Sequence, residues 1–380
     1  MTKRILVIGG GIAGPVTALA LRRAGFEPVV FEAYDRSADE AGAFLTLATN
    51  GLAALETLGL AEQVDAAGFR TPRMHITLGA RELARFPMTS PTPGTPTTVT
   101  LSRAALYRVL REEVDRQGIA VEYGKRLVDA AQDANGVTAT FADGTEERGD
   151  LLVGADGLRS TVRRIIDPQA PAPRYVPLLN TGGYARGVTV PGEPGTVYMG
   201  YGKRAFFAHL PHPNGDVWWF ANIPHKTEPT RADLAAMTDW RERLRALYAD
   251  DDLPARDLVD ATDDIVAPYP TYDFPKVPTW HDRRMVIIGD AAHATSPTAG
   301  QGASMAVEDA VVLAACLRED PATAFAAFEA RRRARVEKVV RMGKRNGNSK
   351  APGVFGRLML PVVIKMLPVQ DMTWLLDHRV

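Results

Sequence analysis

The stretch RILVIGGGIAG, residues 4–14, decides the fold, because an apolar run leads at once into a glycine-rich turn and a helix-forming segment. Residues 4–8 suit a buried parallel strand. Gly9 permits a tight turn, Gly11 lets backbone amides approach a ligand, and Gly14 lets the helix that begins near residue 12 pack closely on the strand. The positive end of that helix would then stabilise a pyrophosphate.

An acidic residue follows at the spacing that a dinucleotide requires. A second apolar run, residues 28–31, ends in Glu32. Roughly 20 residues after the glycines, a carboxylate can accept hydrogen bonds from the diol of an adenosine ribose. NAD and FAD both present a ribose and a pyrophosphate to this geometry, so the motif alone does not distinguish them.

The composition is that of an ordinary globular protein. The chain has 380 residues, 46% hydrophobic and 24% charged, which predicts two domains. The 45 Lys and Arg residues balance the 45 Asp and Glu residues, so no global field favours nucleic acid or an anionic membrane. We expect a cytoplasmic monomer or homodimer that binds a small neutral or mildly charged molecule, with no metal site.

Helix and strand signals alternate along the chain. Ser102 is a candidate N-cap for a helix that extends to residue 114, and a hairpin is predicted over 137–153. Between residues 174 and 270, short aromatic and β-branched runs between Pro and Gly turns favour a mostly antiparallel sheet. One helix is expected within it, starting at a Thr230–Asp233 capping box, with an apolar face formed by Leu234, Met237, Trp240, Leu244 and Leu247.

A second glycine-rich stretch, GDAAHATSPTAGQG at residues 289–302, follows another buried-strand run. Asp290 comes directly after the strand, and a loop with Pro297 leads through Gly300 and Gly302 into a helix. The carboxylate can accept hydrogen bonds from sugar hydroxyls, while amides at a helix N-terminus can stabilise negative charge on a ring. A reduced flavin has both features.

With these stretches in place, the chain resembles the group A flavoprotein aromatic hydroxylases, the single-component FAD monooxygenases typified by para-hydroxybenzoate hydroxylase. The resemblance covers nearly the whole length and depends on three motifs. They are GGGIAG with Glu32, LLVGADGLRSTVR at 151–163, similar to the family's DG motif, and GDAAHATSPTAGQGASMAVEDA at 289–310, similar to its GD motif. Their order, spacing and flanking strands all agree.

The resemblance implies which residues hold FAD. Asp290 would bind the ribityl chain, and the loop from Pro297 to Gly302 would lie against the isoalloxazine ring, so Pro297, Gly300 and Gly302 are the candidate catalytic residues, with no acid or base assigned. His293 is expected to pack or hydrogen-bond rather than act as a base. The candidate FAD-binding residues are Gly9, Gly11, Ala13, Gly14, Glu32, Arg36, Arg103, Asp156, Asp290, Gly300, Gln301, Gly302 and Ala303.

Two departures from the family pattern affect the expected pocket. Ala33 stands where the family often has arginine, so adenine stacking would fall to Arg36 or be absent. Phe44 stands where the family often has glycine, in a segment that usually runs near the flavin ring, and its phenyl group could reshape the pocket. Candidate substrate-lining residues, each equally open to a packing or solvent-facing role, are Phe44, Tyr201, Arg204, Phe220, Asn222 and Pro297.

The resemblance implies a reaction as well as a fold. NADH or NADPH would reduce FAD, dioxygen would form a flavin C4a-hydroperoxide, and an electron-rich aromatic or polycyclic molecule, such as a natural product or antibiotic, would be hydroxylated. The flavin performs the difficult step, so the protein must mainly orient the substrate and exclude water. The resemblance does not distinguish hydroxylation from Baeyer–Villiger oxidation.

Three alternatives fit less well. WFANIP at 219–224 partly matches the W-x-W-x-I-P signature of flavin-dependent halogenases, but Ala221 replaces the second tryptophan and no lysine lies between Lys3 and Lys125. A flavin-linked reductase shares the first motif, and the complete third motif argues against it. A non-catalytic flavin-binding protein is the alternative from a different class, and three intact motifs argue against it.

The expected fold class is α/β (α+β): a Rossmann-like FAD-binding domain with a parallel sheet, a mostly antiparallel β-sheet substrate domain and a C-terminal helix. We assign residues 1–72, 100–173 and 271–340 to the first domain, and 73–99 with 174–270 to the second. Residues 341–380 would form a helical segment packed on the first domain. Its apolar part, residues 354–367, is too short to span a bilayer.

Overall fold

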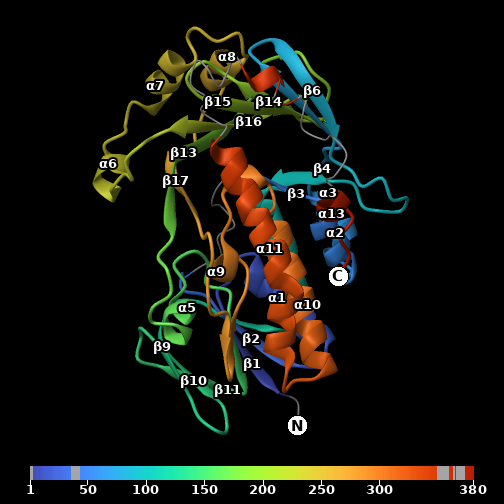
Figure 1. The fold of residues 1–380 in the computed structure, drawn as a ribbon, viewed down its shortest axis with the longest axis vertical. Coiled ribbons are helices and arrows are strands. Elements are labelled where there is room, and N and C mark those ends of the chain that lie inside the picture. Colours follow the sequence, from blue (N-terminus) through green and yellow to red (C-terminus); the bar gives the residue numbers. More distant parts are fainter. Residues whose placement is uncertain (1–2, 36–42, 349–358, 363, 365–372) are drawn as a thin grey trace.

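A computed structural model describes residues 3–35, 43–348, 359–362, 364 and 373–380. A six-stranded sheet and a seven-stranded sheet lie at opposite ends of an elongated molecule (Figure 1). The six-stranded sheet has the order β18-β19-β12-β1-β2-β8 and is parallel except for its β18–β19 edge. Its strands are β1 (Arg4–Ile8), β2 (Glu27–Phe31), β8 (Ala120–Glu122), β12 (Leu151–Gly154), β18 (His281–Asp282) and β19 (Met285–Ile287).

The parallel sheet is covered on both faces, which explains why its central strands β1, β12 and β19 are almost entirely apolar and buried. Helices pack together beside it, namely α1 (Ala13–Arg23), α4 (Arg103–Arg116), α10 (Gly302–Glu319) and α11 (Ala324–Asn348). A three-stranded antiparallel sheet packs against it through Phe141, whose ring lies 4.8 Å from that of Phe31. That sheet contains β9 (Leu127–Gln132), β10 (Val137–Phe141) and β11 (Glu146–Gly149).

Two local predictions in this half are confirmed. The Ser102 hydroxyl accepts a hydrogen bond from the backbone amide of Ala105 at 3.1 Å, so Ser102 is the N-cap of α4. The predicted hairpin is the β10–β11 pair, and the chain then enters β12 beside β1.

The seven-stranded sheet has the order β17-β13-β16-β15-β14-β5-β6, and only its β14–β5 pair is parallel. One face packs against two short helices, α7 (Trp240–Leu247) and α8 (Ala255–Asp260). The strands are β5 (Arg73–Leu78), β6 (Arg81–Pro87), β13 (Arg174–Ala185), β14 (Thr196–Tyr201), β15 (Phe206–Pro211), β16 (Val217–Pro224) and β17 (Tyr269–Asp273).

The single helix predicted after Thr230 is wrong, because the chain forms two helices there. The Thr230–Asp233 capping box is present and starts α6 (Arg231–Ala235), but α7 begins only at Trp240. Thr238 and Asp239, both poor residues for a helix interior, lie in the break, and Asp239 is the N-cap of α7. The expected apolar residues on either side of the break still pack against one cluster beneath the sheet.

A small sheet and two helices join the two ends of the molecule. The sheet contains β3 (Phe44–Leu47), β4 (Phe69–Arg70) and β7 (Val99–Ser102), and the helices are α2 (Thr49–Glu56) and α3 (Ala61–Ala67). Helix α11 runs along much of the length of the molecule, with the short α13 (Thr373–Leu376) beside α2 (Figure 1).

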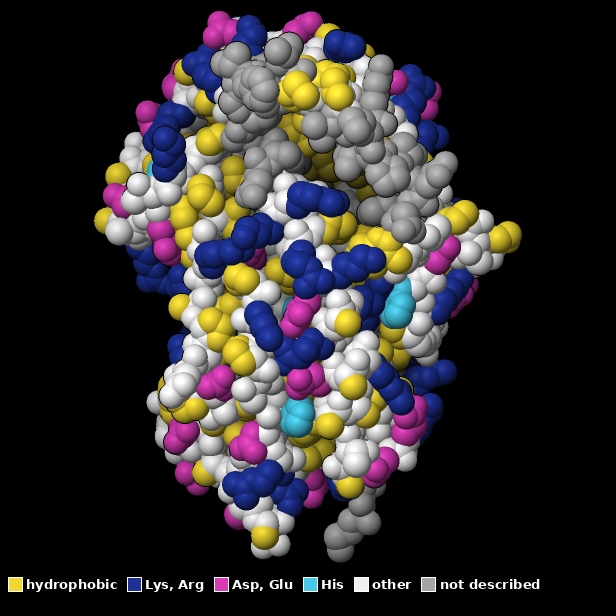
Figure 2. All heavy atoms as spheres, viewed as in Figure 1, with side chains coloured by type: hydrophobic (Ala, Val, Ile, Leu, Met, Phe, Trp, Pro, Cys, Tyr) yellow, Lys and Arg dark blue, Asp and Glu magenta, His cyan; other side chains and the backbone are white. Residues whose placement is uncertain are grey.

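The exposed side of α11 carries many basic side chains over its C-terminal half, whereas acidic and basic groups alternate elsewhere on the same face (Figure 2). Within the described ranges, none of the helices combines the length and the hydropathy needed to cross a bilayer. Most of the predicted apolar segment at 354–367 lies outside the described residues.

Candidate functional site

The first glycine-rich turn is shaped by close backbone packing. Gly9 has a φ of +110°, and a Cβ there would lie 2.4 Å from the carbonyl oxygen of Ala155. A Cβ on Gly14 would lie 1.8 Å from the carbonyl oxygen of Gly9, so only glycine allows α1 to start this close to β1. At Gly11, in contrast, a Cβ would meet no atom within 4 Å. Gly9 and Gly14 therefore shape the turn itself, while Gly11 leaves open space beside the start of α1.

Glu32, at the end of β2, lies directly beside this turn. Its Oε2 accepts a hydrogen bond from the Gly10 amide at 2.6 Å, and its Oε1 accepts one from the Tyr34 amide at 2.9 Å. Because each carboxylate oxygen can accept more than one hydrogen bond, the fixed group can still receive the hydroxyls of a diol.

The second glycine-rich turn follows β19 and contains α9 (Asp290–His293) and a short 3-10 helix, η1 (Pro297–Ala299). Gly300 has a φ of +61° with open space beside it, and α10 then begins at Gly302. The Asp290 carboxyl is exposed, yet the surrounding protein desolvates it enough to raise its pKa. The turn therefore presents a poorly solvated acceptor next to the positive end of an 18-residue helix.

The two turns meet in space. A Cβ on Gly289 would lie 3.4 Å from Cβ of Ala13 in α1 and 3.3 Å from Cβ of Ala306 in α10. The start of α1 therefore lies close to the N-terminal part of α10. Arg103, at the first position of α4, lies near enough to Asp290 for its charge to favour the ionised carboxylate, which partly opposes the rise in pKa.

The middle motif supports both turns. The Asp156 Oδ2 accepts hydrogen bonds from the amides of Thr161 at 2.7 Å and Val162 at 3.1 Å, so it stabilises the first turn of α5 (Thr161–Ile166). Burial raises the pKa of Asp156, and its Oδ1 is buried without a hydrogen-bond partner among the described residues. The buried Arg163 donates to the carbonyl oxygen of Ala291 at 2.8 Å, which ties this motif to the second turn.

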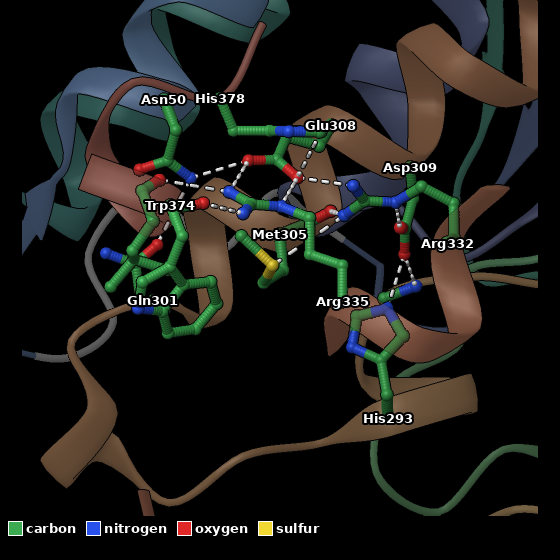
Figure 3. A network of polar contacts seen from close by, with 12 residues as sticks. Asn50, His293, Gln301, Met305, Glu308, Asp309, Arg332, Arg335, Trp374 and His378 are labelled. Carbon is green, nitrogen blue, oxygen red and sulfur yellow. Dashed lines mark hydrogen bonds and ion pairs between the residues drawn. The ribbon is translucent and has the colours of Figure 1, made fainter. Parts of the chain in front are cut away.

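A buried charge network, which the sequence analysis missed, joins α10 to α11 (Figure 3). Glu308 and Asp309 are both 0% exposed. Arg332 donates from Nε to Asp309 Oδ1 at 2.7 Å and also pairs with Glu308. Arg335 approaches Glu308 at 2.8 Å. In the sequence, the network is indicated by the Glu308-Asp309 pair near the end of the third motif and by Arg332 and Arg335. These arginines are three positions apart and therefore share one face of a helix.

The same network fixes the second turn. The Gly289 amide donates to Asp309 Oδ2 at 2.9 Å, and His293 Nε2 contacts the same oxygen. Burial alone would raise the pKa of Asp309, but His293 and Arg332 lower it to about 2. At the other end of the turn, Asn50 links Gln301 to the network (Figure 3). His293 is thus a hydrogen-bonding residue, and the position of the turn depends on a charge cluster beneath it.

Phe44 connects these turns to the seven-stranded sheet. Phe44 in β3 is the register partner of Ser102 in β7, and Ser102 is the residue before Arg103. The Phe44 ring centroid lies 5.3 Å from that of Trp218 and 6.0 Å from that of Phe220. The sheet face opposite α7 and α8 is therefore covered in part by an aromatic side chain from the other half of the molecule.

Strand register places several candidate residues on this same face. Tyr201, Phe206, Asn222, Asn180 and Tyr269 are successive partners across five strands. Two residues earlier on β16, Phe220 shares the face, because side chains alternate along a strand. Burial raises the pKa of Tyr269 while the charge of Arg103 lowers it, so this row of side chains ends near Arg103 and the second turn.

Other candidates lie elsewhere. Arg204 forms an exposed ion pair with Asp250 at 2.7 Å, beyond the end of α7, and does not join the row on the sheet face. Trp219 of the WFANIP segment faces the opposite side of the sheet, where it donates to the Thr262 hydroxyl at 2.8 Å. Pro297 is exposed at the start of η1, and Arg36 lies outside the described residues.

The structure thus gathers most of the candidates around the two turns and the sheet face. Around the turns it places Gly9, Gly11, Ala13, Gly14, Glu32, Arg103, Asp156, Asp290, Pro297, Gly300, Gln301, Gly302 and Ala303. On the sheet face it places Phe44, Tyr201, Phe220 and Asn222. Such an arrangement can hold an extended dinucleotide along the turns and a planar molecule against the aromatic face.

Comparisons with known sequences agree with this geometry. The family model described as FAD binding domain matches residues 2–343. The FAD-dependent urate hydroxylase of Klebsiella pneumoniae is 31% identical over 353 residues, which cover 89% of this chain and 88% of that protein. The aurachin C monooxygenase/isomerase of Stigmatella aurantiaca is 33% identical over 327 residues, which cover 82% of this chain and 80% of that protein.

Solved structures show the same architecture. Klebsiella pneumoniae HpxO complexed with FAD and uric acid superposes with a TM-score of 0.83 at 25% identity, covering 99% of this chain and 95% of that chain. A salicylate hydroxylase substrate complex superposes with a TM-score of 0.81 at 22% identity, covering 99% and 96%, and shows the likeness of fold.

Proposed function

Because this chain belongs to the FAD-binding domain family, together with the FAD-dependent hydroxylases, we propose that it is an FAD-dependent monooxygenase acting on an electron-rich aromatic or polycyclic small molecule. NADH or NADPH and dioxygen are the proposed co-substrates. The observation that carries the proposal is the meeting of two glycine-rich turns beside an aromatic sheet face. One relative named above is a urate hydroxylase by name, and a planar ring such as urate suits that face.

The residues present fit the pyrophosphate, the adenosine ribose, the ribityl chain and the ring of FAD. The open space beside Gly11 admits a pyrophosphate near the start of α1, and Glu32 is placed to accept from the adenosine ribose. We assign Asp290 to the ribityl hydroxyls and the segment from Pro297 to Ala303 to the flavin ring. When bound, FAD supplies the redox and oxygen-transfer chemistry, and the protein supplies position and electrostatics.

The chain's own residues then have three tasks. The amides at the start of α10 stabilise negative charge on the ring side of the turn. The network around Asp309 holds that helix start in place. The aromatic face with Phe44 orients a planar substrate and keeps water away, which supplies much of what such a reaction requires from a protein. We assign no acid or base, so Pro297, Gly300 and Gly302 would act through their backbone.

One observation disfavours the halogenase alternative. Trp219, the first residue of WFANIP, is buried against Phe207 with ring centroids 5.2 Å apart, on the face away from both turns. The domain limits, a cytoplasmic location and a monomeric or homodimeric state remain predictions of the sequence.

Replacing Asp290 tests the assignment of the second turn. In Asp290→Ala we expect the ratio of bound flavin to protein after gel filtration to fall strongly, while Asp263→Ala, which removes an exposed carboxylate outside both turns, leaves it unchanged. Desolvation raises the folded-state pKa of Asp290, so its ionised form disfavours folding at neutral pH. The Asp290→Ala apoprotein should therefore unfold at the same or a higher urea concentration. Unchanged flavin content would refute the ribityl assignment.

A further inference from the structure

One polar side chain on the sheet face has an unmet hydrogen-bond requirement. Asn222 is 2% exposed, and its Nδ2 donates to Asn180 Oδ1 at 2.8 Å. Asn180 is 4% exposed and donates in turn to the Thr271 hydroxyl at 2.7 Å. The Asn222 Oδ1 is buried and accepts no hydrogen bond from the described part of the chain. Because the Asn222 Nδ2 already donates to Asn180, the atom of Asn222 that can still form a hydrogen bond with a ligand is the acceptor Oδ1.

The surroundings of this acceptor are aromatic. Phe206 is the register partner of Asn222 on β15, and its ring centroid lies 5.9 Å from that of Phe220. The Phe44 ring from the other half of the molecule lies 6.0 Å from the same Phe220 ring. A buried polar atom without a hydrogen-bond partner costs free energy. Because the Asn222 Oδ1 is surrounded by aromatic rings, the ligand that suits it is flat and carries one hydrogen-bond donor.

We propose that the Asn222 Oδ1 accepts a hydrogen bond from an N–H or O–H group of the aromatic substrate and thereby selects substrates that carry such a donor. The inference rests on the proposed function, because it takes the molecule against the sheet face to be the substrate. Asn180 is a positioning residue, since it holds the Asn222 amide nitrogen and directs the oxygen away from itself.

We expect the presence or absence of this donor to change kcat/KM strongly. A site built to bond a substrate donor discriminates strongly against an analogue without it, because the buried acceptor is then left unpaired. We expect a donor-bearing compound to exceed its methylated counterpart by about tenfold or more in kcat/KM. Asn222→Ala should reduce that ratio to within about twofold, mainly by lowering kcat/KM for the donor-bearing compound.

The experiment compares uric acid and salicylate, together with a panel of phenols and N–H heteroaromatics, each with its O-methyl or N-methyl derivative. NAD(P)H oxidation gives kcat/KM, hydrogen peroxide release gives the uncoupled fraction, and the shift of the bound-flavin spectrum gives Kd without turnover. The matched control is Thr262→Val, which removes a buried hydrogen bond to Trp219 on the opposite face of the sheet. Asn180→Ala is the second variant and should weaken the preference while Asn222 itself remains.

The outcomes are distinct. A donor preference in the wild type and Thr262→Val that is lost in Asn222→Ala and weakened in Asn180→Ala supports the inference. A preference that survives Asn222→Ala, or no preference in any pair for the wild type, overturns it. If Asn222→Ala loses its flavin or its fold, an unchanged preference in Asn180→Ala overturns it and a weakened one supports it. A wild-type flavin that neither nucleotide reduces contradicts the proposed function instead.

Discussion

Removing Arg332 should cost more stability than removing any surface arginine of the same helix. Arg332 is 1% exposed and bonds both Glu308 and Asp309, which are 0% exposed (Figure 3). In Arg332→Met, Asp309 would keep the Gly289 amide and His293 as partners but would lose its arginine. Breaking a buried ion pair by removing one partner costs about 3–5 kcal/mol, because a buried charge is left uncompensated.

The pKa of Asp309 agrees in direction with this expectation. It falls from an ordinary value of 3.8 to about 2, with burial opposing the fall and His293 and Arg332 causing it. A depression of that size corresponds to about 2–3 kcal/mol of stabilisation of the ionised carboxylate. This value is the net result of burial, His293, Arg332 and the Gly289 amide, so only part of it is lost with Arg332. Because Arg332 also bonds Glu308, the expected total stays at roughly 3–5 kcal/mol.

The assay is urea unfolding of the holoenzyme, followed by circular dichroism and flavin fluorescence, with Arg331→Met as the matched control. Arg331 is the neighbouring residue on α11 and pairs with Glu319 at 2.6 Å, but their side chains are 47% and 54% exposed. An exposed pair of this kind contributes at most about 1 kcal/mol. Equal losses in the two variants, or a loss below about 1 kcal/mol in Arg332→Met, would refute the reasoning.

Two further predictions follow from the site. The free energy of unfolding should decline as the pH falls below about 4 toward 2. The folded-state pKa of Asp309 is depressed, so the stabilisation from its carboxylate is complete above the unfolded-state pKa and is lost as the pH falls through the folded-state pKa. A urea midpoint that is flat over this interval would contradict the prediction. Gly11→Ala should leave the apoprotein as stable as the wild type but reduce flavin retention, because the added Cβ meets only open space. Gly14→Ala should also destabilise the apoprotein, because its Cβ would lie 1.8 Å from the Gly9 carbonyl oxygen. Equal apoprotein stabilities for the two variants would contradict this distinction.

The features predicted best from the sequence depend on short-range rules. The Ser102 cap and the Thr230 capping box are each determined by residues three positions apart, and both are present. The turn at Gly9 follows from the geometry of a strand that leads directly into a helix, which leaves little choice of residue. Phe44 departs from a family pattern in a segment expected near the flavin ring, and the structure places it against the aromatic sheet face.

The features that sequence reasoning missed depend on partners distant in the chain. Glu308 and Arg332 come from different helices, and their pairing requires the crossing of α10 and α11 to be known. Arg204 is a candidate as an expected member of the substrate sheet, but it lies between β14 and β15, and its partner Asp250 follows a helix that packs on the other face of the sheet. The break between α6 and α7 cannot be read from the sequence because the apolar spacing continues across it.

The most direct test of the account is anaerobic addition of NADPH, and separately NADH, to the purified protein. The account predicts a yellow protein whose flavin absorption is bleached by at least one nucleotide, faster when a substrate is present, and recovers when dioxygen is admitted. A protein that retains no FAD after reconstitution, or a bound flavin that neither nucleotide bleaches, would contradict the central claim that this chain is an FAD-dependent monooxygenase.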